Sequence, residues 1–277
     1  MSNLAAAFKE FDEAIKRQAH RARAEAVSRR LEQSLKRAFR AQGTKVIQAM
    51  RKHIRGHFAE GFDGHAAFLE TPLKETVSEN DWLGAWIEAE QATAKLFSEP
   101  IDAAVAKALQ TVALAMIGDI GMDISFSLDN PRAVRYLDQY GANLVKGLGV
   151  TTESDLRGLI SQATDDGWSW KQLEGAIGTQ FSDYVNGDRS HLIAVTEVGE
   201  AYSEGNYIVG KDLQDAGLDM EKSWDPAGDG CPEICAPNAE QGWIPLDEQF
   251  QSGHDRPLGH PGCWCDMFIR RVGSNEE

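Results

Sequence analysis

The sequence is poor in the residues that mark several specialised protein classes. It has only 4 cysteines and 9 prolines in 277 residues, too few for a disulfide-dense or a collagen-like protein. The hydrophobic share of 42% and the charged share of 26% are ordinary for folded proteins, which argues against a disordered chain. The length predicts one or two domains, each with a hydrophobic core.

Long apolar runs are missing too. The first residues, MSNLAAAFKEFDEAIKR, contain acids and lack the basic start and apolar stretch of a secretion signal, so no export is expected. The longest apolar run, residues 108–118, is interrupted by Gln110 and Thr111 and falls short of the ~20 residues that a spanning helix needs. We therefore expect no membrane segment, and a buried helix at this position.

Basic residues are scarce outside the first fifth of the chain. Residues 1–57 hold 14 Lys and Arg against 5 Asp and Glu, a net charge of +9. The remaining residues hold 14 against 38, a net charge of −24, although the whole chain sums to −15. This asymmetry predicts a cationic N-terminal arm that meets an anionic partner, and an acidic body that DNA repels. A solvated basic helix face with no partner is the alternative.

The N-terminal half has helical periodicity. Apolar positions recur at helical spacing over residues 4–40, which predicts a long amphipathic helix. We expect Gly43 to end it and Thr44 to cap a second, short helix. Residues 56–80 have no clear period and are expected to form a loop. Residues 81–118 are again helical, with Pro100 expected to open a new helix.

Helical signals continue to about residue 210. We expect a helix that begins after Asn130 and is ended by Gly147 and Gly149. Two short helices with capping boxes at Thr152 and Ser169 should follow, separated by a turn at Gly167. One more amphipathic helix is predicted over residues 188–210. The fold class predicted is mainly α, with long N-terminal helices and a helical body, followed by a small loop-rich α+β module that carries cysteine and histidine.

All four cysteines fall within that last module, in two short segments. The first knuckle is Cys231-Pro-Glu-Ile-Cys235 and the second is His260-Pro-Gly-Cys263-Trp-Cys265. Six of the nine prolines lie in the same stretch, residues 217–265. This composition predicts loops that need a cross-link, such as a disulfide or a metal ion, to be stable. Four soft ligands on two knuckles can supply a tetrahedral zinc site, and His260 can replace one thiolate.

Three interpretations of the cysteines stay open at this stage. The spacings C-x3-C and C-x-C depart from the common C-x2-C of zinc knuckles. One structural zinc ion is the first interpretation, one or two disulfides in an oxidised particle the second, and plain buried thiols the third. The candidate metal ligands are Cys231, Cys235, His260, Cys263 and Cys265.

No catalytic motif is visible. HExxH, GxSxG, a Walker A loop and a GxGxxG motif after a strand are all missing. A cysteine nucleophile with His254 or His260 would not need three further thiols beside it. We therefore assign no catalytic residue and expect that the protein is not an enzyme.

The stretch from Arg189 to Cys265 resembles the C-terminal domain of the phage Mu F-like minor head proteins, also called head morphogenesis proteins. The resemblance rests on a helix with His191-Leu-Ile-Ala-Val-Thr-Glu197, on Trp224-Asp225, on the two knuckles, and on a Pro245-Leu-Asp247 turn with Phe250. The family's last block usually has Arg where Trp264 stands and Pro where Gly259 stands. Neither departure removes a candidate metal ligand from this sequence.

The resemblance implies a structural minor capsid protein of a tailed phage or prophage. Such a protein associates with the portal protein and the inner capsid surface, and acts in procapsid assembly, DNA packaging or ejection. It would lie in the virion head, and in the host cytoplasm during assembly. The domains expected are a basic helical arm over residues 1–60, an acidic helical domain over 61–182, and the Mu F-like domain with its knuckles over 183–277.

The basic arm gives the candidate partner surface. The residues expected to contact the portal, or packaged DNA, are Arg17, Arg21, Arg29, Arg30, Lys36 and Arg37. Two alternative functions remain at this stage: a DNA-binding accessory factor that uses this arm, and an injected effector.

Overall fold

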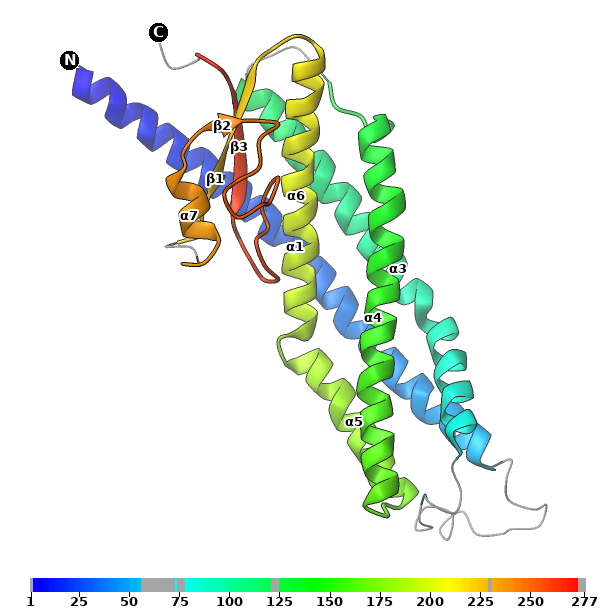
Figure 1. Ribbon diagram of the computed structural model, residues 1–277. Coiled ribbons are helices and arrows are strands. Elements are labelled where there is room, and N and C mark those ends of the chain that lie inside the picture. Colours follow the sequence, from blue (N-terminus) through cyan, green and yellow to red (C-terminus); the bar gives the residue numbers. More distant parts are fainter. Residues whose placement is uncertain (1, 56–72, 74–77, 121–124, 229–230, 274–277) are drawn as a thin grey trace. The chain divides into compact units, whose positions relative to one another are not determined.

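The computed structural model describes residues 2–55, 73, 78–120, 125–228 and 231–273 (Figure 1). The chain is mainly helical and ends in a small module with a three-stranded sheet, so the predicted fold class is confirmed. The helices are α1 (Ser2–Arg55), α3 (Glu79–Ile120), α4 (Pro131–Asp165), α5 (Trp170–Asn186), α6 (Arg189–Asp215) and α7 (Cys235–Glu240). The strands are β1 (Met220–Asp225), β2 (Ile244–Pro245) and β3 (Asp266–Arg271).

The chain forms two compact units, each assembled from separate stretches. Unit 1 comprises Met1–Glu32, Ile101–Gln139 and His191–Glu277, and unit 2 comprises Gln33–Pro100 and Tyr140–Ser190. The three sequential segments expected from the sequence are a different division and stay a prediction.

Unit 1 contains the small sheet. The strand order is β2-β1-β3, and β1 pairs antiparallel with both neighbours. The core beside it comes from α3 and α6, which cross closely at Gly205. A Cβ at that position would lie 2.5 Å from Val112 Cγ1 and 2.9 Å from the carbonyl oxygen of Leu109. Glycine is therefore required by helix packing at this crossing.

Unit 2 is helical in the residues that the structure describes. Its core includes the ring of Phe39, which lies 5.0 Å from that of Phe97 and 5.2 Å from that of Tyr184. The guanidinium of Arg189 stacks 3.9 Å from the centre of the Tyr184 ring and pairs with Asp155 at 3.3 Å. An aromatic cluster closed by a stacked arginine thus ties α1, α3, α4 and α5 together.

Two helices continue through residues that were expected to break them. α1 passes Gly43 and runs to Arg55, so the predicted stop and the cap at Thr44 are wrong. A glycine inside a helix costs only about 1 kcal/mol, and here it lets Phe181 approach to 2.7 Å from where a Cβ would stand. α3 likewise contains Pro100 in its interior and does not begin anew there.

α4 shows the same effect, whereas the start of α5 agrees with its prediction. Gly147 and Thr152 lie inside α4, so the predicted helix end and the first capping box are wrong. The Thr152 hydroxyl instead donates to the Leu148 carbonyl at 2.8 Å. Ser169 does form a capping box with Gln172 at the start of α5, and Gly167 makes the preceding turn with a positive φ of 69°.

The basic N-terminal segment is packed against acidic residues within unit 1. His20 is 2% exposed, and its Nε2 lies 3.1 Å from Asp119 Oδ2. Arg21 Nη2 lies 3.9 Å from Asp225 Oδ2. The cationic arm expected from the sequence therefore has one buried face in this part of α1, and its Arg21 is paired inside the unit.

One described helix is apolar over a long stretch. Residues Asp81–Asp119 of α3 are long and apolar enough to cross a membrane by length and composition alone. Half of the most apolar window is buried in the structure, and a core helix meets the same criterion, so this is weak support for a membrane helix. The loop expected over residues 56–80 falls almost entirely outside the described residues.

Candidate metal centre

The antiparallel pairing of β1 and β3 brings the two knuckles together. Asp225, the last residue of β1, pairs with Asp266, the first of β3. The chain after β1 carries the first knuckle, and the chain before β3 carries the second, which ends at Cys265. The sheet register therefore places the two segments side by side, at one end of the strands.

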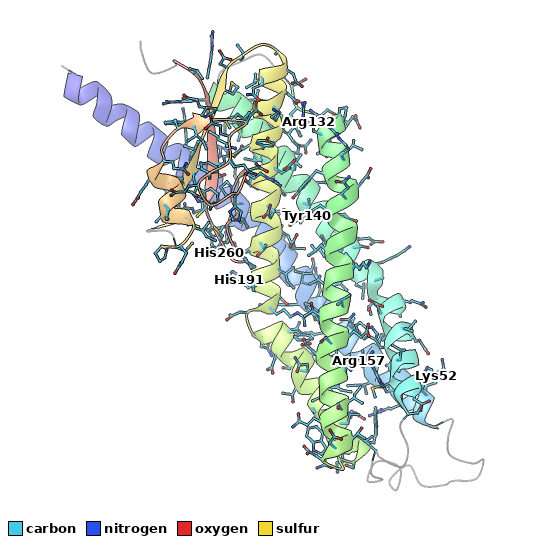
Figure 2. The ribbon with its side chains drawn as sticks, viewed as in Figure 1. Lys52, Arg132, Tyr140, Arg157, His191 and His260 are labelled. Carbon is cyan, nitrogen blue, oxygen red and sulfur yellow. The ribbon has the colours of Figure 1, made fainter. Side chains whose placement is uncertain are left out.

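The five candidate ligands converge as the sequence predicts. Two groups have donor atoms within 4.8 Å of one another: Cys231, Cys235 and His260 in one, and Cys235, Cys263 and Cys265 in the other. Cys235 belongs to both groups. His260 lies near α7, which begins at Cys235 (Figure 2). Cys235 joins the two groups into one cluster of five donors, one more than a tetrahedral metal ion uses.

One distance in the cluster fits a tetrahedral thiolate site. Cys235 Sγ and Cys263 Sγ lie 3.7 Å apart. Two sulfurs bound to zinc at about 2.3 Å with tetrahedral angles are about 3.8 Å apart, so no rearrangement of this pair is needed. A disulfide needs about 2.05 Å, and all four cysteines are free thiols in this structure.

The cluster is set in an apolar environment. Cys235, Cys263 and Cys265 are buried, while Cys231 is half-buried and His260 is exposed. Trp224 and Phe250 pack beside the thiols, with their rings at 5.1 Å in an edge-to-face arrangement. An ion held here would be largely shielded from solvent, which is typical of a closed structural site.

The four thiols differ in pKa. The thiol of Cys265 donates to Cys263, which lowers the pKa of Cys263 to about 5 and raises that of Cys265. Burial raises the pKa of Cys235 to about 11, while the backbone N–H of Cys235 lowers the pKa of Cys231. Four clustered thiols cannot all ionise without a cation, and a metal ion would stabilise the thiolate forms together.

Two glycines hold the second knuckle in place. Gly262 has a φ of 75°, and its backbone N–H donates to Thr196 Oγ1 of α6 at 2.9 Å. At Gly259 a Cβ would lie 2.6 Å from Ile234 Cγ2 in the first knuckle. A side chain at position 259 would therefore prevent this close contact between the knuckles.

A buried lysine fixes the loop between the knuckles. Lys222 of β1 is 1% exposed, and its Nζ donates to the Asp255 carbonyl at 2.7 Å. The ammonium also lies 5.2 Å from the centre of the Phe250 ring. Burial lowers the pKa of Lys222 to about 8. Sequence reasoning missed this residue, because a lysine within a short strand gives no sign of being buried.

The other histidine considered for cysteine chemistry lies elsewhere. His254 Nδ1 is 2.9 Å from Ser252 Oγ, which also accepts a hydrogen bond from the Asn238 amide at 2.7 Å. Neither of the two metal-ligand groups found among the described residues includes His254.

The six basic residues proposed for partner binding do not share one environment. Arg29, Arg30 and Arg37 are exposed, whereas Lys36 is half-buried. Arg21 faces Asp225, as described above, and the side chain of Arg17 lies outside the described residues. Among the six, Arg29, Arg30 and Arg37 are therefore the described candidates whose side chains are exposed to solvent.

Comparisons with models of protein families, with curated proteins and with solved structures found no match.

Proposed function

We propose that this chain is a structural minor head protein of a tailed phage or prophage, which associates with the portal vertex and acts in procapsid assembly, DNA packaging or ejection. The observation that supports the proposal is the convergence of the resembling elements. The knuckles, Trp224 and Phe250 form one cluster, and α6, which carries residues 191–197, anchors it through Thr196. These residues are far apart in the sequence but close in space, which indicates that they belong to one domain.

We further propose that the cluster holds one structural zinc ion. The buried thiols, the 3.7 Å separation of Cys235 and Cys263 and the surplus of donors fit such an ion. When bound, zinc would cross-link the two knuckles and add to the small hydrophobic core of this loop-rich module. Cys231, Cys235 and Cys263 would hold it, with either His260 or Cys265 as the fourth ligand.

Quantitative mass spectrometry of purified particles tests the head assignment. The phage or induced prophage that encodes the chain should yield particles that contain it at a copy number near that of the portal protein. A matched gradient fraction from a deletion strain is the control. Detection only outside the particles would contradict the assignment.

A second candidate function is DNA binding in the packaged head, favoured by the exposed Arg29, Arg30 and Arg37. Anisotropy of a labelled duplex should then show affinity that falls steeply with salt, because phosphate contacts release counterions. Changing these three residues to Glu should reduce the salt slope. Changing Lys95, Lys107 and Arg135, which are exposed on α3 and α4, provides the control. Unchanged binding in the α1 variant would exclude this function.

A further inference from the structure

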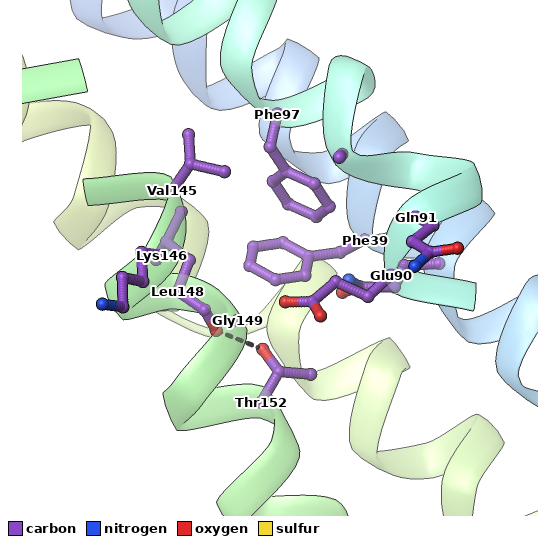
Figure 3. A pocket seen from close by; sticks show the side chains of 11 residues that line it. Phe39, Glu90, Gln91, Phe97, Val145, Lys146, Leu148, Gly149 and Thr152 are labelled. Carbon is purple, nitrogen blue, oxygen red and sulfur yellow. Dashed lines mark hydrogen bonds between the residues drawn. The ribbon is translucent and has the colours of Figure 1, made fainter. Parts of the chain in front are cut away.

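Unit 2 contains a cavity that no part of the proposed function uses. It has a volume of about 390 Å³ and lies among α1, α3 and α4 (Figure 3). Cavities of about 150 Å³ can hold a benzene molecule, and ligand pockets commonly begin near 300 Å³. The cavity therefore has room for a ring or branched alkyl group with a short chain attached.

Much of the lining is apolar. The rings of Phe39 and Phe97 meet edge to face at 5.0 Å, and Val145 and Leu148 of α4 lie across from them in Figure 3. Phe39 is fully buried and Phe97 is 4% exposed. An apolar body placed against these side chains would be removed from water, which favours binding by about 25 cal/mol for each Å² covered.

Two hydrogen-bond acceptors also line the cavity. Gln42 is 4% exposed, and its Oε1 is buried without a hydrogen-bond partner in the described part of the chain. The half-buried carboxyl group of Glu90 lies against α4 at Gly149, where a Cβ would collide with it. A buried acceptor without a donor is unfavourable, so a ligand that brings donors would be stabilised here.

The charge of the lining favours a cation. Burial, and then the negative charge of Glu153, raise the pKa of Glu90. A bound cation would oppose both of these influences, because it stabilises the ionised carboxylate of Glu90. Lys146 also borders the cavity, but its amino nitrogen points away from the two phenylalanine rings in Figure 3. The hydroxyl of Thr152 is already engaged, since it donates to Leu148 and accepts from Arg189.

We propose that this cavity binds a small organic cation with an apolar body, namely a primary ammonium carried by an aromatic or branched alkyl group. The apolar body lies against Phe39 and Phe97. The ammonium donates to the side-chain oxygens of Glu90 and Gln42, which accept no other hydrogen bond from the described residues. This site is independent of the metal centre and of the head assignment.

Isothermal titration of the full chain with 2-phenylethylammonium tests the proposal. Its neutral analogue 2-phenylethanol and the anion 3-phenylpropionate keep the ring but change the charged group. We expect the ammonium to bind at least about 10-fold more tightly than the alcohol, because a hydrogen bond between charged groups contributes about 1.5–3 kcal/mol. The anion should not bind.

Variants on one helix locate the binding. Glu90→Gln should weaken the ammonium by about 10-fold and leave the alcohol unchanged. Ala94→Phe, which fills the cavity, should abolish binding of both compounds. Glu99→Gln, exposed on the same helix and outside the lining, is the matched control and should bind as the wild type does. Circular dichroism of each variant confirms that it is folded.

Several results would overturn the proposal. Equal affinity for ammonium and alcohol, or an unchanged Glu90→Gln variant, would show an apolar cavity without selection for cations. Preference for the anion would assign the site to Lys146 instead. If none of the three compounds binds at millimolar concentration, the cavity is not a ligand site and holds only water.

Discussion

At the scale of single residues, the contact between Gly259 and Ile234 makes a sharp prediction. Gly259→Ala should lower the free energy of unfolding by about 1–3 kcal/mol, because the new methyl group would lie 2.6 Å from Ile234 Cγ2. Ile234→Ala removes the obstructing atom, so the double variant should recover part of the loss. Urea unfolding of the two single variants and the double variant measures this coupling. Simple additivity would contradict the packing described here.

Lys222 predicts a pH dependence of stability. Its pKa is about 8 in the folded protein and 10.5 in the unfolded chain, so between these values the unfolded chain binds more protons. The free energy of unfolding should therefore rise with pH in this window, by at most about 1.4 kcal/mol per pH unit. This contribution is absent in Lys222→Met.

Urea unfolding at about pH 8 and about pH 10, with metal content kept constant, isolates this contribution. The stability difference between wild type and Lys222→Met should shift in favour of the wild type as the pH rises. A difference that stays constant would show that the ammonium is not desolvated in the folded protein.

At the scale of elements, the crossing of α3 and α6 depends on Gly205. Gly205→Ala should destabilise unit 1 by about 1–3 kcal/mol, because the added atom meets the Leu109 backbone, which cannot move without shifting α3. Gly178→Ala in α5 is the matched control, since nothing lies within 4 Å of its added methyl group. It should stabilise by about 0.5–1 kcal/mol through helix propensity. Thermal unfolding that ranks the two variants equally would contradict the crossing.

The helix boundaries show what local sequence signals can predict. Ser169 and Gly167 were predicted correctly because a capping box and a positive-φ turn are satisfied within a few residues. Gly43, Pro100 and Gly147 were predicted to interrupt helices and do not. At Gly43 the local cost is outweighed by packing against Phe181, and no window of the sequence contains that contact.

The candidate site likewise has features that the sequence predicts and features that it does not. The five donors were predictable, because cysteines and a histidine confined to two short segments indicate a shared ligand. The Thr196 anchor, the burial of Lys222 and the contact between Gly259 and Ile234 were not predictable, since each joins positions that only the fold brings together. The cavity near Phe39 and Glu90 gave no sequence signal for the same reason.

At the scale of the whole molecule, the charge asymmetry of the sequence is partly neutralised inside unit 1. Residues 1–57 carry +9 and the rest −24, but Arg21 of this segment faces Asp225 at 3.9 Å within unit 1. Some of the segment's basic groups therefore serve its own fold, and fewer remain for a partner than the sequence suggests.

The proposed zinc ion makes a prediction about the stability of the full chain. Chelation should lower the Tm by about 10 °C or more, because each kcal/mol shifts Tm by about 2–4 °C in chains of this size and a structural zinc contributes several kcal/mol. Differential scanning calorimetry with and without chelator measures the shift. A Tm that does not change while metal is removed would show that the ion has no structural role.

The most direct measurement is native mass spectrometry of the full chain together with thiol titration. We predict one zinc ion per chain in the wild type and in His260→Gln, because the cluster contains five donors and a tetrahedral ion uses four. Cys235→Ser should lose the ion, since Cys235 belongs to both ligand groups. A metal-free wild-type protein, with either four titratable thiols or none, would contradict the account.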